Sequence, residues 1–224
     1  MATAAERIAK VKPARIVIAD DHELVRRGLV ATLAEVKGWT VVSEAANGRE
    51  AVEQVALHKP DIAILDLTMP QLNGLDATRQ IQATQVTTSV LILTAHESEQ
   101  LIREVLSAGA RGYVLKSDAG RSLVSAVEAL LDGRPYFTSK VAALVLEGYL
   151  RSPDNTDGIP TLSTREREIV QLLAEGRSNK EVARVLSISV KTAETHRSNI
   201  MRKMQFSSLS DLVRYAVRNK IIDV

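Results

Sequence analysis

The stretch DIAILDLTMPQLNG, residues 61–74, decides how this chain folds. Its first half, Asp61–Leu67, is a short apolar run that favours a strand buried on both faces. Its second half contains Pro70, Asn73 and Gly74, which break regular structure. Asp66 lies near the end of the predicted strand, and a parallel sheet carries its functional groups at such strand ends.

The same pattern of an apolar run followed by a helical stretch recurs on both sides of this segment. Further strands are predicted over Arg15–Asp20, Trp39–Ala45, Ser89–Ala95 and Tyr113–Lys116. Five apolar strands that alternate with five helices predict a doubly wound α/β fold around a five-stranded parallel sheet.

The pattern changes after Gly133. A further helix is predicted over Val141–Tyr149, and Arg151–Pro160 is a polar segment typical of a linker. Strand signals are then absent, and four short helices are predicted over Ser163–Glu175, Ser178–Leu186, Val190–Met204 and Ser208–Arg218. We therefore expect two domains, residues 15–133 and a small all-α domain at 161–224, joined by residues 134–160.

Composition excludes several classes of protein. The chain of 224 residues has no cysteine, which excludes disulfide scaffolds, thiolate zinc sites and cysteine nucleophiles and suits a reducing cytoplasm. No apolar run approaches the ~18 residues of a membrane span, and no secretory signal is recognisable. The net charge of +2 divides into −2 for residues 1–150 and +4 for residues 151–224, and the basic second part suggests a nucleic-acid partner.

Polar side chains gather at the predicted ends of four strands. Asp20 and Asp21 follow the first, Asp66 the third, and Thr94 and Lys116 end the last two. One aspartate after a strand is common and means little, but five such residues at one sheet edge are hard to explain by accident. Three carboxylates suit Mg²⁺, and a lysine with a hydroxyl could hold phosphoryl oxygens.

These residues resemble the receiver domain of two-component response regulators, which is flavodoxin-like. The resemblance covers about residues 15–133 and includes Met69-Pro70, Asn73-Gly74, Thr94-Ala95 and Tyr113 three residues before Lys116. It departs at Ser117, where many receivers have proline.

The resemblance implies a role for each residue of the predicted site. Asp66 would accept the phosphoryl group of a sensor histidine kinase as a 4-aspartylphosphate. Asp21, Asp66 and the backbone carbonyl of Thr68 would ligate Mg²⁺, with Asp20 acting through water. Lys116 would pair with the added charge, and Thr94 and Tyr113 would form the switch. The only enzymatic activity expected is this self-catalysed phosphotransfer and slow autodephosphorylation.

The second domain contains a predicted helix-turn-helix. On its second helix, Ala193, His196, Ile200 and Met204 form a stripe that packs, and the opposite stripe is polar and basic. A basic face on one helix is usually only a solvated surface. The tight spacing of the two helices and the positive charge of the domain favour DNA.

Leu162–Glu166, Gly176–Ala183 and Ser189–Ile200 resemble a LuxR-type DNA-binding domain, so the whole chain resembles a NarL/FixJ-type response regulator. By this resemblance Glu194, Thr195 and Ser198 would face bases. Phosphate contacts would come from Lys180, Lys191, Thr192, Arg197 and Lys203. The last helix would join two copies into a homodimer on double-stranded DNA.

Alternative functions remain open. An aspartate-nucleophile phosphohydrolase would carry a D-x-D motif that Asp66-Leu67-Thr68 lacks. Nucleotide or flavin binding would require a glycine-rich turn after the first strand, where the acids stand instead. A regulator that binds DNA independently of phosphorylation is the nearest alternative.

Overall fold

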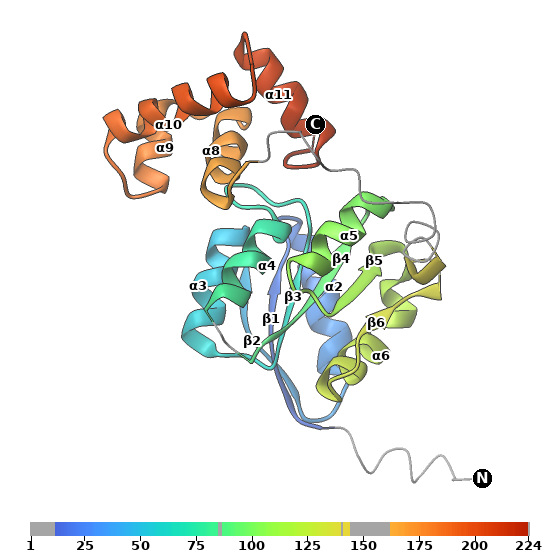
Figure 1. Ribbon diagram of the computed structural model, residues 1–224. Helices are drawn as coiled ribbons and strands as arrows, with labels where there is room; N and C mark the ends of the chain where they lie inside the picture. Colours follow the sequence, from blue (N-terminus) through green and yellow to red (C-terminus); the bar gives the residue numbers. More distant parts are fainter. Residues whose placement is uncertain (1–11, 85–86, 140, 144–161, 224) are drawn as a thin grey trace, which may run out of the picture.

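The computed structural model describes residues 12–84, 87–139, 141–143 and 162–223. Within these ranges an α/β domain carries a helical domain over one end of its sheet (Figure 1). The predicted linker Arg151–Pro160 lies outside the described residues, as does most of the helix predicted over Val141–Tyr149, of which residues 141–143 are helical.

The sheet is parallel throughout, with the strand order β2-β1-β3-β4-β5-β6. Its strands are β1 (Ala14–Ala19), β2 (Trp39–Ala45), β3 (Ile62–Leu65), β4 (Ser89–Thr94), β5 (Gly112–Leu115) and β6 (Tyr136–Phe137). The prediction of five strands was one strand short, because β6 has two residues and such a short strand shows no alternating pattern.

Helices cover both faces of the sheet, as predicted. They are α2 (Glu23–Ala34), α3 (Gly48–His58), α4 (Gly74–Ala83), α5 (Glu99–Ser107) and α6 (Ala119–Leu131). One apolar core joins α3, α4 and α5 to the sheet, and a second joins α2 and α6 to its other face. Apart from the exposed Arg15 in β1 and the half-buried Ser89 at the start of β4, the side chains of β1, β3 and β4 are buried and apolar until the strands end.

The C-terminal domain contains α8 (Thr164–Ala174), α9 (Asn179–Val185), α10 (Val190–Lys203) and α11 (Leu209–Arg218) around one apolar core. Capping boxes begin at Ser163, Ser178 and Ser208. Each box satisfies main-chain N–H groups that a helix start leaves without partners. No helix in the described ranges is long and apolar enough to cross a membrane.

Helix α8 docks on the loop between β3 and α4. Gln171 on α8 is fully buried, and its Oε1 accepts a hydrogen bond from the main-chain N–H of Asn73 at 2.9 Å. Its Nε2 donates to the carbonyl oxygen of Met69 at 2.8 Å. The helical domain therefore contacts the loop that leads away from Asp66.

Gly74 provides a test of the close packing behind this loop. A Cβ atom at Gly74 would overlap the main-chain carbonyl oxygen of Asp66, whereas a Cβ at Gly120 on α6 would have open space. We expect Gly74→Ala to lower the free energy of unfolding by about 2 kcal/mol. Gly120→Ala, the matched control, should not be destabilising. Urea unfolding followed through the fluorescence of Trp39, the single tryptophan, measures the stability of both variants. If Gly74→Ala is as stable as Gly120→Ala, the predicted clash is contradicted.

Candidate functional site

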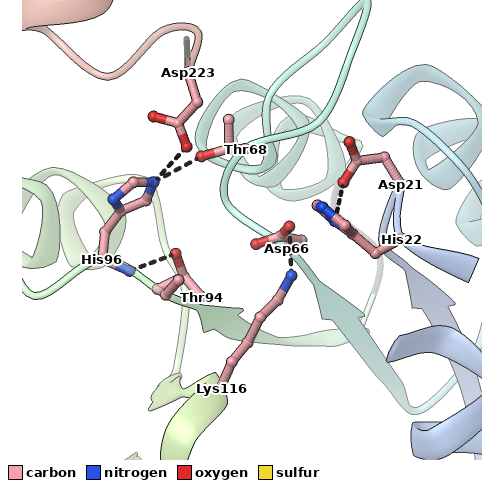
Figure 2. Close-up of a pocket in the computed structure, with 9 residues that line it drawn as sticks. Asp21, His22, Asp66, Thr68, Thr94, His96, Lys116 and Asp223 are labelled. Atoms are coloured by element: carbon pink, nitrogen blue, oxygen red, sulfur yellow. Dashed lines mark hydrogen bonds and ion pairs between the residues drawn. The ribbon is translucent and has the colours of Figure 1, made fainter. Parts of the chain in front are cut away.

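An acidic pocket lies at the carboxyl ends of β1 and β3, where the strand order places these two strands side by side. Asp20 and Asp21 follow β1, and Asp66 follows β3 (Figure 2). One ligand atom from each of these three carboxylates and from His22 lies within 4.8 Å of the others. The predicted convergence of the acids is confirmed, and His22 joins them.

Lys116 compensates the negative charge of this pocket. Its Nζ lies 2.7 Å from Asp20 Oδ2 and 2.8 Å from Asp66 Oδ2. Burial lowers the pKa of Lys116, but the hydrogen bonds and charges of the two aspartates outweigh it, so that pKa is raised. Burial also raises the pKa of Asp66, an effect that Lys116 opposes and only partly cancels.

The main chain holds Asp66 in a fixed position. Its N–H donates to the carbonyl oxygen of Ala19 at 2.8 Å, and its Oδ1 accepts from the N–H of Leu67 at 2.7 Å. The carboxylate is 5% exposed, yet it lines a cavity of about 150 Å³ with Thr68, Thr94 and Lys116. A small group can therefore reach a carboxylate that is otherwise shielded from water.

Thr94 and Tyr113, the predicted switch residues, are both bonded to the main chain of His96. The Thr94 hydroxyl accepts from the His96 N–H at 3.2 Å, and the Tyr113 hydroxyl donates to the His96 carbonyl oxygen at 2.8 Å. Tyr113 is completely buried, and burial, with the charges of Glu97 and Asp66, raises its pKa. The Tyr113 phenol is therefore neutral and able to donate.

Two residues that the sequence reading missed meet at the edge of this cavity. His96 Nε2 lies 2.8 Å from Asp223 Oδ2 and 3.0 Å from Thr68 Oγ1. His96 could have been found by its position two residues after Thr94. Asp223 could not, because no local pattern places the C-terminal tail beside a strand end more than one hundred residues away.

The loop after β5 differs from the family pattern at Ser117, as the sequence indicates. Lys116–Asp118 form a short 3₁₀ turn, and the described residues contain no cis peptide bond. Lys116 nevertheless reaches both aspartates, so the substitution leaves its ion pairs intact.

Helices α9 and α10 form the predicted helix-turn-helix. The N–H of Ile188 donates to the carbonyl oxygen of Ala183 across the turn, and Ala193 is buried where α10 packs in the core. Ser189 caps α10 by accepting from the N–H of Thr192. His196 is half-buried, which agrees with its predicted packing role.

Most of the predicted DNA contacts are available on the surface. Those that are exposed are Lys180, Lys191, Thr192, Glu194, Thr195, Ser198 and Lys203. Lys203 is paired with Glu166 at 2.7 Å, and the half-buried Arg197 bonds Asn179 at 3.5 Å. To contact a phosphate, Lys203 would have to leave or share Glu166, and Arg197 would have to leave or share Asn179.

Two family models match the chain. The response regulator receiver domain matches residues 16–128, and the bacterial regulatory proteins of the luxR family match residues 160–216. The chain belongs to the response regulators. It combines a receiver with a LuxR-type DNA-binding domain, and it is a transcriptional regulator by family rather than an enzyme.

This response regulator has a relative that covers most of its length. It is 39% identical over 215 residues to the oxygen regulatory protein NreC of Staphylococcus carnosus, covering 93% of this chain and 99% of that protein. A LuxR-family two-component response regulator from Aurantimonas sp. SI85-9A1 is 36% identical with a TM-score of 0.60, covering 62% of this chain and 100% of that chain.

A third relative is known with nucleic acid bound. The response regulator RcsB in complex with DNA is 26% identical with a TM-score of 0.58, covering 91% of this chain and 98% of that chain.

Replacing Lys116 tests its role as the cation of the pocket. In Lys116→Met two buried carboxylates lose their partner, and we expect the free energy of unfolding at pH 7 to fall by roughly 3 kcal/mol. The loss should shrink as the pH is lowered through the raised pKa of Asp66, because a protonated carboxyl needs no ammonium. Lys37→Met, at an exposed position, is the control. If both variants unfold at the same urea concentration at pH 7, Lys116 does not stabilise the pocket.

Proposed function

We propose that this response regulator is switched by phosphorylation of Asp66 by a sensor histidine kinase. The observation that carries the proposal is the joint placement of Asp66, Lys116 and Thr94 on one small cavity. An Asp66 carboxylate oxygen forms a bond to phosphorus as the bond from phosphorus to the kinase histidine nitrogen breaks. The other ring nitrogen of the phosphohistidine is protonated before transfer, so the histidine leaves as neutral imidazole, and the product is a 4-aspartylphosphate.

The acidic cluster fits a magnesium ion. Asp20, Asp21 and Asp66 offer hard carboxylate oxygens within 4.8 Å of one another; Asp21 and Asp66 would ligate the ion directly, Asp20 would act through water, and the carbonyl oxygen of Thr68 would add a neutral ligand. When bound, Mg²⁺ supplies positive charge that reduces repulsion between the carboxylate and the incoming phosphoryl group. His22 is the fourth group of the cluster, but imidazole is a poor match for Mg²⁺, so we assign it no ligand role.

Lys116 and Thr94 then stabilise the product. The ammonium of Lys116, already 2.8 Å from Asp66, pairs with a phosphoryl oxygen. The Thr94 hydroxyl leaves the N–H of His96 to donate to another phosphoryl oxygen, and Tyr113 follows the movement of this loop. A charge added at Asp66 thus changes hydrogen bonds at the end of β4. Slow autodephosphorylation occurs when water attacks the same phosphorus atom.

The helical domain reads DNA with α10. Glu194, Thr195 and Ser198 face base edges, while Lys180, Lys191, Thr192, Arg197 and Lys203 contact phosphates. The active form is a homodimer, as in the RcsB dimers known on DNA. Leu209 on α11 is 41% exposed and available to a second copy, whereas Leu212 and Ala216 close the core of the domain. Because its partner is chromosomal DNA, the protein acts in the cytoplasm.

Asp66→Asn tests the phosphorylation site. We expect the parent protein to gain one phosphoryl group from acetyl phosphate and Mg²⁺, measured by intact mass, and Asp66→Asn to gain none, because an amide is not a competent nucleophile. Removing Mg²⁺ with EDTA should reduce incorporation to background. Asp132→Asn, at an exposed site, should behave as the parent. Equal incorporation by Asp66→Asn would show that the site assignment is wrong.

A second test concerns phosphate contacts by α10. We expect Lys191→Ala to weaken binding to double-stranded DNA of any sequence and to reduce the slope of log affinity against log salt by about 1. Fluorescence anisotropy with a labelled duplex measures both quantities, and Lys37→Ala in the receiver is the control. An unchanged salt slope would remove Lys191 from the interface. DNA affinity that is identical for phosphorylated and free protein would favour a regulator independent of phosphorylation.

A further inference from the structure

We propose that Asp223, from the C-terminal tail of the DNA-binding domain, is a specificity-determining residue of the phosphorylation pocket. Its carboxylate disfavours phosphodonors of high negative charge while the two domains are docked. The inference rests on the proposed phosphorylation of Asp66 and adds a residue from outside the receiver.

Asp223 stands between the pocket and the cleft that separates the domains. It lines the cavity of about 150 Å³ together with Asp66 and Lys116. It also lines an adjoining cavity of about 210 Å³ with Pro70 and Glu175. Figure 2 shows Asp223 and Lys116 on opposite sides of Asp66. A phosphodonor that approaches Asp66 in this docked form therefore meets the carboxylate of Asp223.

Specific contacts hold the tail in this place. Ile221 is fully buried in the core of the helical domain, and its N–H donates to the carbonyl oxygen of Ala216 at 2.8 Å. Two residues later, Asp223 Oδ2 lies 2.8 Å from His96 Nε2. Because a carboxylate only accepts, that nitrogen carries the hydrogen. The tail is thus anchored to its own domain and bonded to the receiver.

The charge of the pocket explains why one more carboxylate matters. The residues that line the smaller cavity include the carboxylates of Asp21, Asp66 and Asp223 but a single ammonium, that of Lys116. An arriving phosphoryl group adds negative charge to this set. The side chain of Asp223 is 43% exposed, so water screens its charge and the effect on rate is moderate.

Coupling runs in both directions. If the charge of Asp223 makes phosphorylated Asp66 less stable in the docked form, then a phosphoryl group on Asp66 must oppose docking of the tail by the same free energy. The other interdomain contacts do contain cations, in the ion pairs of Arg167 with Asp76 and of Arg49 with Glu168, but neither arginine lines the pocket. The carboxylate of Asp223 is the negative group of the helical domain that lines the pocket directly.

The test compares phosphodonors of different charge on the full-length protein. Initial rates of phosphorylation are measured with acetyl phosphate, a dianion near neutral pH, and with phosphoramidate, which carries about one negative charge less, both with Mg²⁺. For Asp223→Asn we expect the apparent second-order rate constant to rise about fivefold with acetyl phosphate and about twofold with phosphoramidate at low salt. Both gains should diminish at high ionic strength.

Matched variants separate charge from structure. Asp223→Glu restores the charge and should return the donor preference toward that of the parent. Glu128→Gln changes the net charge equally at an exposed site on α6 and should have no effect. An unchanged rate in Asp223→Asn would overturn the inference. A gain in rate that is equal for both donors and insensitive to salt would also overturn it, because such a gain reports only that the docking of the domains has loosened.

Failure of the proposed function gives a different result. If the parent takes up no phosphate, or if Asp66→Asn takes it up equally, the phosphorylation of Asp66 is wrong and the role of Asp223 falls with it. If Asp66 is required and Asp223→Asn behaves as the parent, only the further inference fails.

Discussion

The ion pairs from Lys116 to Asp20 and Asp66 are the interaction on which the pocket depends. Asp20 is 1% exposed and Asp66 5%, so their charges are poorly hydrated and would repel each other strongly without a cation. The ammonium makes the acidic cluster compatible with a stable fold. The same ammonium stands ready to pair with a phosphoryl oxygen, so the group that stabilises the resting protein also serves the proposed chemistry.

The parallel sheet brings this set together. Asp20 and Asp66 follow neighbouring strands, and Thr94 and Lys116 end the next two in the strand order. Apolar residues fill both faces of the sheet around β3 and β4 up to the point where these strands end, so the polar groups gather at the carboxyl edge. Gly74 then allows the chain to return close behind Asp66, where a side chain would collide with the main chain.

The contact between the domains is largely polar, which suits a contact that must open. Gln171 and Glu168 of α8 are buried at it, and Gln171 bonds the loop that follows Asp66. Such interfaces permit relative motion of domains more readily than large apolar ones. The two domains therefore communicate through the segment that carries the proposed phosphorylation site and through Asp223 at its edge.

The sequence by itself determined the α/β order, the second helical domain and the acids at the strand ends, because these depend on local periodicity and on the direction of the strands. Only the tertiary structure decided that β6 joins the sheet, that His96 faces Thr68, and that Asp223 reaches the pocket. These are contacts between segments distant in sequence, made by short stretches without a repeating pattern. The first two form within the packed receiver and the third only where the two domains dock, so no local run of residues encodes them.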